Sequence, residues 1–208
     1  MKINAFCTSS VDSALKSCDR LNYCGDDEIT DKRVDKYRFG GEAGEKGGIY
    51  IPDMLDETAF GNACDFVINT GKRAIVRAAF ELEEAGIIEA RYKLSPIMLL
   101  HKMGVLEYCA IAGGVCLDND DLDLMAQDGA VLIVTPTASA GYGHGFAPVC
   151  AAVSRGIRVG IGTFDGKYNK SADLLKELEF LRLTANAEMR TENALDDATL
   201  EKILAFEQ

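Results

Sequence analysis

A chain of 208 residues, 48% of them hydrophobic, is long enough to bury one substantial core, so we expect a single domain over residues 1–208. The formal net charge of -11 argues against nucleic acid and membrane partners, because both require a positively charged protein surface. No apolar run approaches a membrane span, and the first residues do not form a signal-peptide pattern, so a cytoplasmic location is predicted. Seven cysteines without a CxxC pair indicate reduced thiols.

The N-terminal region begins with an apolar run at residues 2–9 that is typical of a strand. Residues 11–21 have apolar side chains at helical spacing and predict a helix. Residues 24–48 are polar, charged and rich in glycine, so they are predicted to form a long loop or linker segment.

The middle of the chain alternates between helical and strand patterns. Asp56 can cap a helix over residues 57–68 that Gly71 ends. Residues 74–79 follow as a buried strand, and residues 81–91 as a helix. This order is typical of repeated βα units.

The same alternation continues to the C-terminus. Ser95 and Pro96 have the residue types of a helix N-cap and first turn, and Gly104 ends that helix. Asp118 or Asn119 caps a later helix. Further strands are predicted at residues 107–115, 130–135 and 157–163, and further helices near residues 148–155 and 171–189. Apolar strands alternating with helices predict the α/β class, with a parallel sheet covered by helices.

Four segments in this region form an ordered series: SPIMLLHKMGVL at 95–106, AGGVCLD at 112–118, VTPT at 134–137 and GTF at 162–164. They resemble successive motifs of the amidohydrolase superfamily, in its chlorohydrolase, cytosine deaminase and S-adenosylhomocysteine deaminase-like branch. The similarity covers roughly residues 72–190. It implies a TIM-barrel-like (β/α)8 fold, of which about five main strands are recognised. We therefore expect a partial barrel, and we expect a homodimer to cover its exposed sheet edge.

The resemblance also shows which metal ligands of the family are missing. It places a metal-binding histidine at Cys116, a second histidine at Val134, a further histidine where Arg77 stands, and the metal-binding aspartate at Phe164. The chain contains two histidines in all. A catalytic zinc needs about three firm protein ligands, so no metal and no cofactor are predicted, with a divalent metal such as zinc as the alternative.

The candidate site residues follow the ends of the predicted strands, where parallel sheets collect their ligands. Cys116, His144 and Asp165 are the candidate catalytic residues. The candidate ligand-binding residues are Arg77, Glu81, Thr135, Ser139, Tyr142 and Phe164. We expect Arg77, Cys116, Thr135, His144 and Asp165 to converge on one cleft.

Two functions remain open from the sequence. One is a degenerate, metal-free amidohydrolase-like protein that binds a small molecule or a protein partner. The other is an active hydrolase or deaminase that acts on a small nitrogen-containing substrate through Cys116, His144 and Asp165. A third arrangement, in which a separate chain completes the barrel, is also compatible with the motifs.

Overall fold

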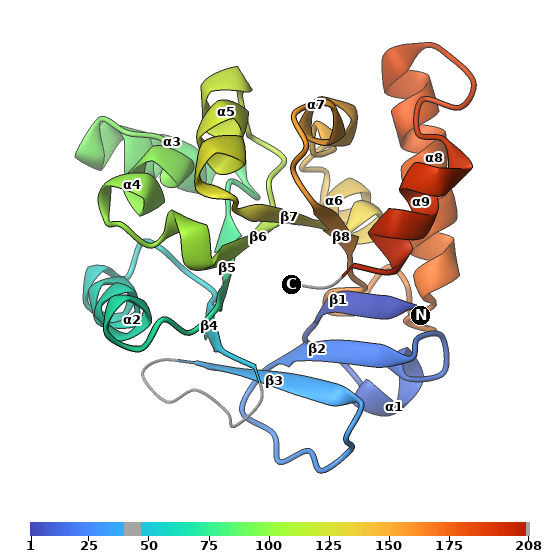
Figure 1. Cartoon of the computed structure of the whole chain (residues 1–208), viewed down its shortest axis with the longest axis horizontal. Helices are drawn as coiled ribbons and strands as arrows, with labels where there is room; N and C mark the ends of the chain where they lie inside the picture. Colours follow the sequence, from blue (N-terminus) through green and yellow to red (C-terminus); the bar gives the residue numbers. More distant parts are fainter. Residues whose placement is uncertain (40–46, 207–208) are drawn as a thin grey trace.

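The computed structural model describes residues 1–39 and 47–206, and it arranges eight parallel strands in chain order as a barrel (Figure 1). The strands are β1 (Ile3–Cys7), β2 (Arg20–Cys24), β3 (Val34–Phe39), β4 (Ile49–Ile51), β5 (Ala74–Ala78), β6 (Cys109–Gly113), β7 (Val131–Val134) and β8 (Val159–Ile161). The predicted order of β5 to β8 is confirmed, since each pairs in parallel with the next. The fold is a (β/α)8 barrel-like α/β fold.

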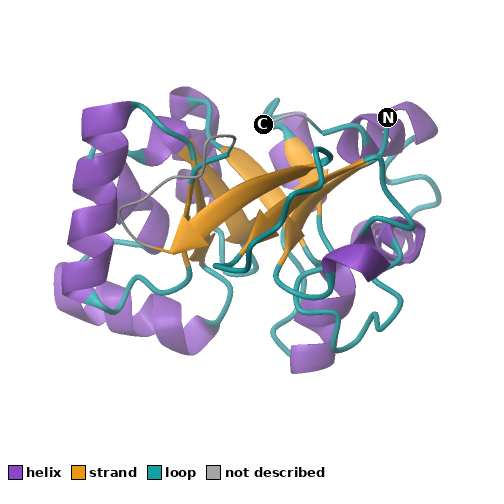
Figure 2. Ribbon diagram, turned by 90° about the horizontal axis from the view of Figure 1, so that it is seen from below, coloured by secondary structure: helices purple, strands orange, loops and turns teal. Residues whose placement is uncertain are grey.

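Helices surround the strands on the outside of the barrel (Figure 2). They are α1 (Val11–Ala14), α2 (Glu57–Thr70), α3 (Leu82–Tyr92), α4 (Pro96–Lys102), α5 (Asn119–Asp128), α6 (Pro136–Tyr142), α7 (Val149–Ser154), α8 (Leu174–Met189) and α9 (Asp197–Leu204), with a 3-10 turn η1 (Leu106–Tyr108) before β6. The predicted caps are confirmed. The side chains of Asp56, Ser95 and Asp118 accept hydrogen bonds from the first turns of α2, α4 and α5, and Gly71 and Gly129 adopt the left-handed conformation at the ends of α2 and α5.

The barrel is nearly closed where β8 meets β1. The Asn4 side-chain amide donates to Thr163 Oγ1 at 2.9 Å and its oxygen accepts from the Thr163 backbone amide at 3.2 Å. Beyond it, the Phe164 amide donates to Phe6 O at 3.0 Å, and the Thr8 amide donates to Phe164 O at 2.9 Å. The expected five strands and partial barrel are therefore corrected to eight strands and a nearly complete ring. The predicted homodimer loses the exposed edge on which it was based, and it stays a prediction.

The three strands missing from the prediction lie in the N-terminal quarter. The predicted helix 11–21 is reduced to α1, and β2 begins at Arg20. The predicted loop 24–48 contains β3, while its residues 40–46 lie outside the described residues. On β3, Val34 and Tyr37 are buried while Lys36 and Arg38 lie near Glu28. A short strand with so many charged residues has a composition that is also typical of a loop.

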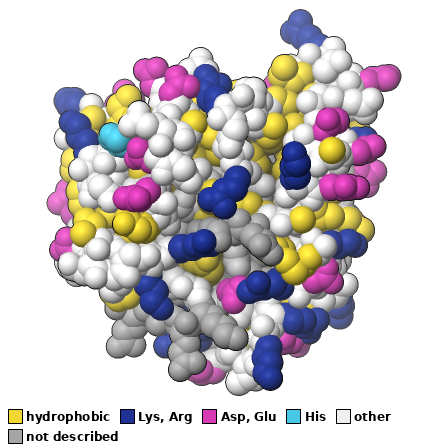
Figure 3. All heavy atoms as spheres, in the orientation of Figure 1, with side chains coloured by type: hydrophobic (Ala, Val, Ile, Leu, Met, Phe, Trp, Pro, Cys, Tyr) yellow, Lys and Arg dark blue, Asp and Glu magenta, His cyan; other side chains and the backbone are white. Residues whose placement is uncertain are grey.

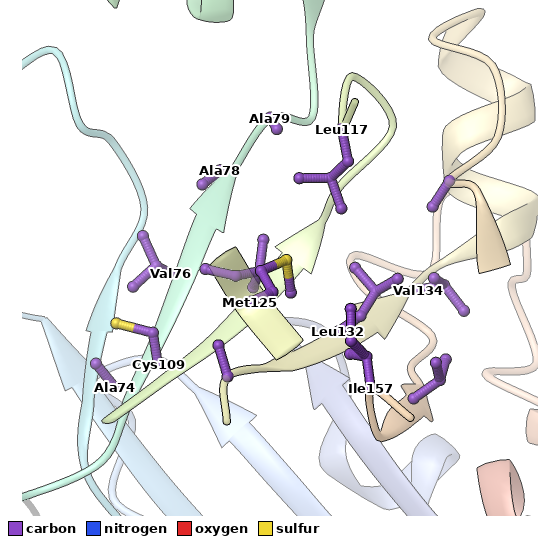
Figure 4. Packing of buried hydrophobic residues seen from close by; sticks show 14 of the residues in the cluster. Ala74, Val76, Ala78, Ala79, Cys109, Leu117, Met125, Leu132, Val134 and Ile157 are labelled. Atoms are coloured by element: carbon purple, nitrogen blue, oxygen red, sulfur yellow. The ribbon is translucent and has the colours of Figure 1, made fainter. Parts of the chain in front are cut away.

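Two apolar clusters follow from the alternation of side chains along each strand. The larger cluster lies between strands and helices, and Figure 4 shows Val76 of β5, Leu132 of β7 and Met125 of α5 within it. The smaller cluster fills the barrel interior. Its buried members are Ala5, Phe6, Cys24, Tyr37, Tyr50, Ile75, Ala110, Ala112, Val131, Ile133 and Phe206.

Phe206 follows α9 and packs into the barrel interior. Its side chain is 4% exposed. A Cβ atom on Gly160 of β8 would lie 2.7 Å from the Phe206 ring and 3.0 Å from the Ala5 side chain. Glycine at this position therefore gives the phenylalanine its space between β1 and β8.

A buried carboxylate fixes α8 against the barrel. Glu177 accepts hydrogen bonds from the Thr137 amide and from Asn169 Nδ2, both at 3.0 Å, and from the Thr137 hydroxyl. Burial raises the pKa of Glu177, and these hydrogen bonds oppose the rise. The interaction joins the start of α6 to the helix that follows β8.

The molecular surface has an uneven charge distribution. On the face drawn in Figure 3, lysine and arginine side chains gather around the middle, although the chain has a net charge of -11. Within the described ranges, no helix combines the length and apolar character needed to cross a membrane.

Candidate functional site

A cleft of about 430 Å³ opens at the carboxyl ends of the strands. Its lining comes from the ends of β1, β3, β4, β5 and β8 and from the loop after α6. The lining residues are Thr8, Phe39, Tyr50, Pro52, Arg77, Phe80, Glu81, Tyr142, His144, Phe164 and Asp165. Six of the nine predicted site residues therefore meet in one place: Arg77, Glu81, Tyr142, His144, Phe164 and Asp165.

Arg77 enters the cleft because it follows Ile75 on the inward face of β5, two residues along the strand. Its Nε donates to Pro52 O at 2.8 Å, and its Nη1 donates to Glu81 Oε1 at 3.0 Å. Its guanidinium also lies 5.8 Å from the centre of the Phe80 ring. These contacts hold the cation in a fixed orientation beside the cleft.

Glu84 lies behind Arg77 and has an unusual environment. Its side chain is 5% exposed, and neither carboxylate oxygen has a hydrogen-bond partner within the described part of the chain. The nearest cation is Arg77, whose Nη2 is 3.9 Å from Glu84 Oε1. Burial raises the pKa of Glu84 to about 7; Arg77 opposes the rise, and the carboxylates of Asp53 and Glu81 add to it.

Aromatic side chains fill the centre of the barrel mouth. Phe164 stacks on Phe6 with ring centres 5.3 Å apart and meets the Phe80 ring edge-on at 5.7 Å. Tyr50 packs 5.5 Å from Phe6 and 5.3 Å from Phe39. Phe164 has φ of 51°, a left-handed conformation that is uncommon for a bulky side chain, and two strand-closing hydrogen bonds fix it there.

His144, Tyr142 and Asp165 form the opposite wall. The His144 ring packs 4.8 Å from Phe80 and 5.7 Å from Tyr142, and its Nε2 lies 3.9 Å from Glu81 Oε1. The Tyr142 hydroxyl donates a hydrogen bond to Asp165, which raises the pKa of Tyr142 to about 12. This wall combines ring faces with a carboxylate acceptor.

The other three predicted site residues lie outside this cleft, which corrects the expected convergence of Cys116 and Thr135 on it. The half-buried Cys116 follows β6, and its amide donates to Ala79 O at 2.9 Å. Burial, with Glu84 and Glu81, raises the pKa of Cys116, which disfavours a thiolate nucleophile. Thr135 and Ser139 line a separate small space beside α8, because α6 begins directly after Thr135 and turns both residues toward Leu181.

The residues of the cleft do not fit a catalytic metal. Within residues 1–39 and 47–206, no group of three or more histidine, cysteine, aspartate and glutamate side chains could hold a metal ion. Phe164 lies where the resemblance places the metal-binding aspartate, and its ring offers no ligand atom. Arg77 adds a fixed positive charge to the same cleft and pairs with Glu81. A zinc ion requires several nitrogen, sulfur or oxygen ligands in tetrahedral geometry, which this arrangement does not supply.

Three prominent members of the site were not predicted from the sequence. Phe39 and Tyr50 belong to β3 and β4, which were not recognised as strands. Glu84 has the sequence position of an exposed acidic residue in the first turn of α3. The signal available for Tyr50 was its place between Ile49 and Ile51, an apolar triplet typical of a buried strand.

Comparison with known proteins gives matches in one superfamily. No protein-family model matches the chain. A 5-methylthioadenosine/S-adenosylhomocysteine deaminase of Caldicellulosiruptor saccharolyticus is 29% identical over 116 residues, which are 55% of this chain and 27% of that protein. The corresponding deaminase of Halothermothrix orenii is 35% identical over 96 residues, which are 46% of this chain and 22% of that protein. The chain thus spans about a quarter of the length of these relatives.

Solved structures with this fold include two zinc-containing enzymes. An adenosine deaminase of Xanthomonas campestris superimposes with a TM-score of 0.72 and 18% identity, over 84% of this chain and 38% of that one. An atrazine chlorohydrolase of Arthrobacter aurescens superimposes with a TM-score of 0.68 and 16% identity, over 89% of this chain and 47% of that one. The solved structures show the same fold, and the sequence matches to these deaminases support the resemblance of the four motifs to the amidohydrolase superfamily.

Proposed function

We propose that this chain is a degenerate, metal-independent amidohydrolase-like protein that binds a small molecule in the cleft at the carboxyl ends of its strands. One observation carries the proposal: Phe164 stacks on Phe6 and meets the Phe80 ring edge-on at the position where the resemblance expects a metal-binding aspartate. A packed aromatic cluster excludes both the metal and the water that it activates. The same cluster gives the cleft an apolar floor for a ligand.

The alternative is an active hydrolase or deaminase, and the positions of the candidate catalytic residues separate the two. His144 and Asp165 line the cleft, but Cys116 does not. Its raised pKa also removes the advantage of a thiol nucleophile. A deaminase of this kind needs an activated water, and the described residues of the cleft provide no set of metal ligands to activate one.

The two functions are distinguished by a turnover assay together with a search for bound molecules. 5′-Methylthioadenosine and S-adenosylhomocysteine, the substrates named for the relatives, are incubated with the protein in the presence and absence of zinc. We expect no deamination above the rate without protein. We also expect mass spectrometry of the purified, unheated protein to detect a small molecule that is released on denaturation.

A variant that fills the cleft shows where the molecule binds. Thr8 lines the cleft, so Thr8→Trp is expected to eliminate the co-purified molecule, whereas Thr191→Trp on the exposed loop after α8 is expected to retain it. Unchanged melting temperatures for both variants establish that the fold is intact. Zinc-dependent deamination by the unmodified protein would contradict the proposal and support the active enzyme.

A further inference from the structure

The charged side chains that line the described part of the cleft have an excess of negative charge. Among the described lining residues, Arg77 contributes one positive charge, and Glu81 and Asp165 contribute two negative charges. Arg77 is already paired with Glu81 at 3.0 Å, and Glu84 lies behind it at 3.9 Å. Among the described lining residues, the charged group without an ion pair is therefore Asp165, which accepts a hydrogen bond from the neutral Tyr142 hydroxyl, and the Lys167 ammonium lies at the rim.

The walls of the cleft are aromatic, and ring faces attract cations. Five of the lining side chains are Phe39, Tyr50, Phe80, Tyr142 and Phe164. The rim already shows this interaction, because Lys167 Nζ lies 4.5 Å from the centre of the Tyr142 ring and 5.2 Å from that of Tyr168. Aromatic walls beside carboxylates are the usual surroundings of a bound ammonium group.

Glu84 provides an independent indication of a missing positive charge. A carboxylate that is 5% exposed, with both oxygens lacking hydrogen bonds in the described chain, is stabilised poorly by one guanidinium at 3.9 Å. A second cation in the cleft, close to Glu81, would stabilise the ionised form of Glu84. The isolated carboxylate is thus explained if the occupied cleft holds a cation.

We propose that the ligand of this cleft is an organic cation, in which a protonated amine faces Glu81 and Asp165 and an aromatic or other apolar body packs on Tyr50, Phe80 and Phe164. This inference rests on the proposed small-molecule function of the same cleft. It adds the charge and chemical class of the ligand.

Binding of a cation in the cleft is coupled to release of a proton from Glu84. The groups that face Glu84 are Arg77 on β5, Glu81 before α3, Asp53 after β4, Tyr50 on β4 and Cys116 after β6. With its pKa near 7, Glu84 is partly protonated in the empty cleft. A bound cation favours the ionised carboxylate, so a fraction of one proton passes to the solvent at pH 7, and affinity rises with pH up to about that value and then levels off.

The test uses three probes of the same shape and different charge: benzylamine, which is protonated at neutral pH, benzyl alcohol and benzoate. Calorimetry with the full chain at pH 8 is expected to show that the benzylammonium ion binds about tenfold more tightly than benzyl alcohol, and that benzoate binds more weakly still. The double variant Glu81→Gln, Asp165→Asn is expected to lose this preference while it retains its affinity for benzyl alcohol. Glu179→Gln on the exposed side of α8 serves as the matched control and is expected to retain the preference.

Proton release is measured by titration of benzylamine at pH 7 in two buffers that differ in ionisation enthalpy. We expect release of a fraction of one proton by the unmodified protein and none by Glu84→Gln, whose affinity is also expected to be independent of pH between 6 and 8. Equal or tighter binding of benzyl alcohol or benzoate would overturn the cation assignment and leave the small-molecule function intact. If none of the three probes binds, the cation assignment is also overturned, and a co-purified neutral or anionic molecule would still support the proposed function.

Discussion

The two halves of the barrel are built differently. β1 to β4 lie within residues 3–51, and the described connections between them contain one helix, the four-residue α1. β5 to β8 extend over residues 74–161, and helices follow each of these strands. The first half is therefore thinly covered and the second is thickly covered (Figure 1). A complete ring of strands does not require equal helical cover, because its interior and its hydrogen bonds are shared around the ring.

The candidate site draws different chemistry from each half. The first half provides ring surfaces from Phe39 and Tyr50. The second half provides further rings and also the charged side chains of the described lining, Arg77, Glu81 and Asp165. Phe6 and Phe164 join the two halves at the β1 and β8 boundary. Both halves thus contribute aromatic walls to the cleft, and the charged side chains of its described lining come from the thickly covered half.

The largest effect is expected where both halves depend on one side chain. Phe206 lies between Ala5 of β1 and Gly160 of β8, so Phe206→Ala should leave a cavity inside the barrel. We expect a loss of about 3–5 kcal/mol in the free energy of unfolding, measured by urea denaturation. Phe146→Ala is the control, since that ring is 42% exposed, and about 1 kcal/mol or less is expected. Equal losses for the two variants would show that Phe206 does not join the halves.

A direct comparison of the halves uses the same truncation in each. Val76 on β5 is fully buried beneath helices, whereas Val34 on β3 is 9% exposed in the thinly covered half. Val76→Ala is expected to cost about 2–3 kcal/mol of unfolding free energy and Val34→Ala about 1 kcal/mol. Paired denaturation curves measure the difference. An equal or larger cost at Val34 would remove the contrast between the halves.

The smallest effect concerns the pH dependence of stability. Glu84 has a pKa near 7 in the folded chain against an ordinary value of 4.5, so the folded state binds more protons between these values and becomes less stable as pH rises through that window. Glu84→Gln removes this loss. We expect the free energy of unfolding of the variant, measured against that of the unmodified protein, to be about 1–2 kcal/mol more favourable at pH 8 than at pH 5. Melting temperatures across this range test it. A constant difference between the two proteins would contradict the burial of an unsatisfied carboxylate.

The contrast between halves also explains which parts of the fold were predictable from the sequence. Helices α2, α4 and α5 carry capping residues, Asp56, Ser95 and Asp118, whose side chains bond locally to the chain that follows them. β2 and β3 lack such local signals, and β4 offers only the apolar triplet at residues 49–51. Their burial depends on strand pairing with distant residues and on closure of the ring, which no short window of sequence contains.

The candidate site was also predictable in part, where its residues follow directly from the ends of the strands. Arg77, Phe164 and Asp165 converge because parallel strands end on one side of the barrel. This rule can be applied once the ends of the strands are known from the sequence. Thr135 and Ser139 fall outside because α6 starts one residue after β7 and turns them toward α8. Glu84 was not predictable, because its burial comes from packing behind Arg77, not from its position in α3.

The central claim is that the aromatic cluster around Phe164 takes the place of a metal site. Calorimetric titration of zinc into the metal-depleted protein tests it directly, with Phe164→Asp titrated alongside. We predict no tight, stoichiometric binding by the unmodified protein and little gain by the variant, because one carboxylate without histidine ligands cannot hold zinc in a tetrahedral site. Tight binding of one zinc ion by the unmodified protein would contradict the account and favour the alternative of a metal-dependent enzyme.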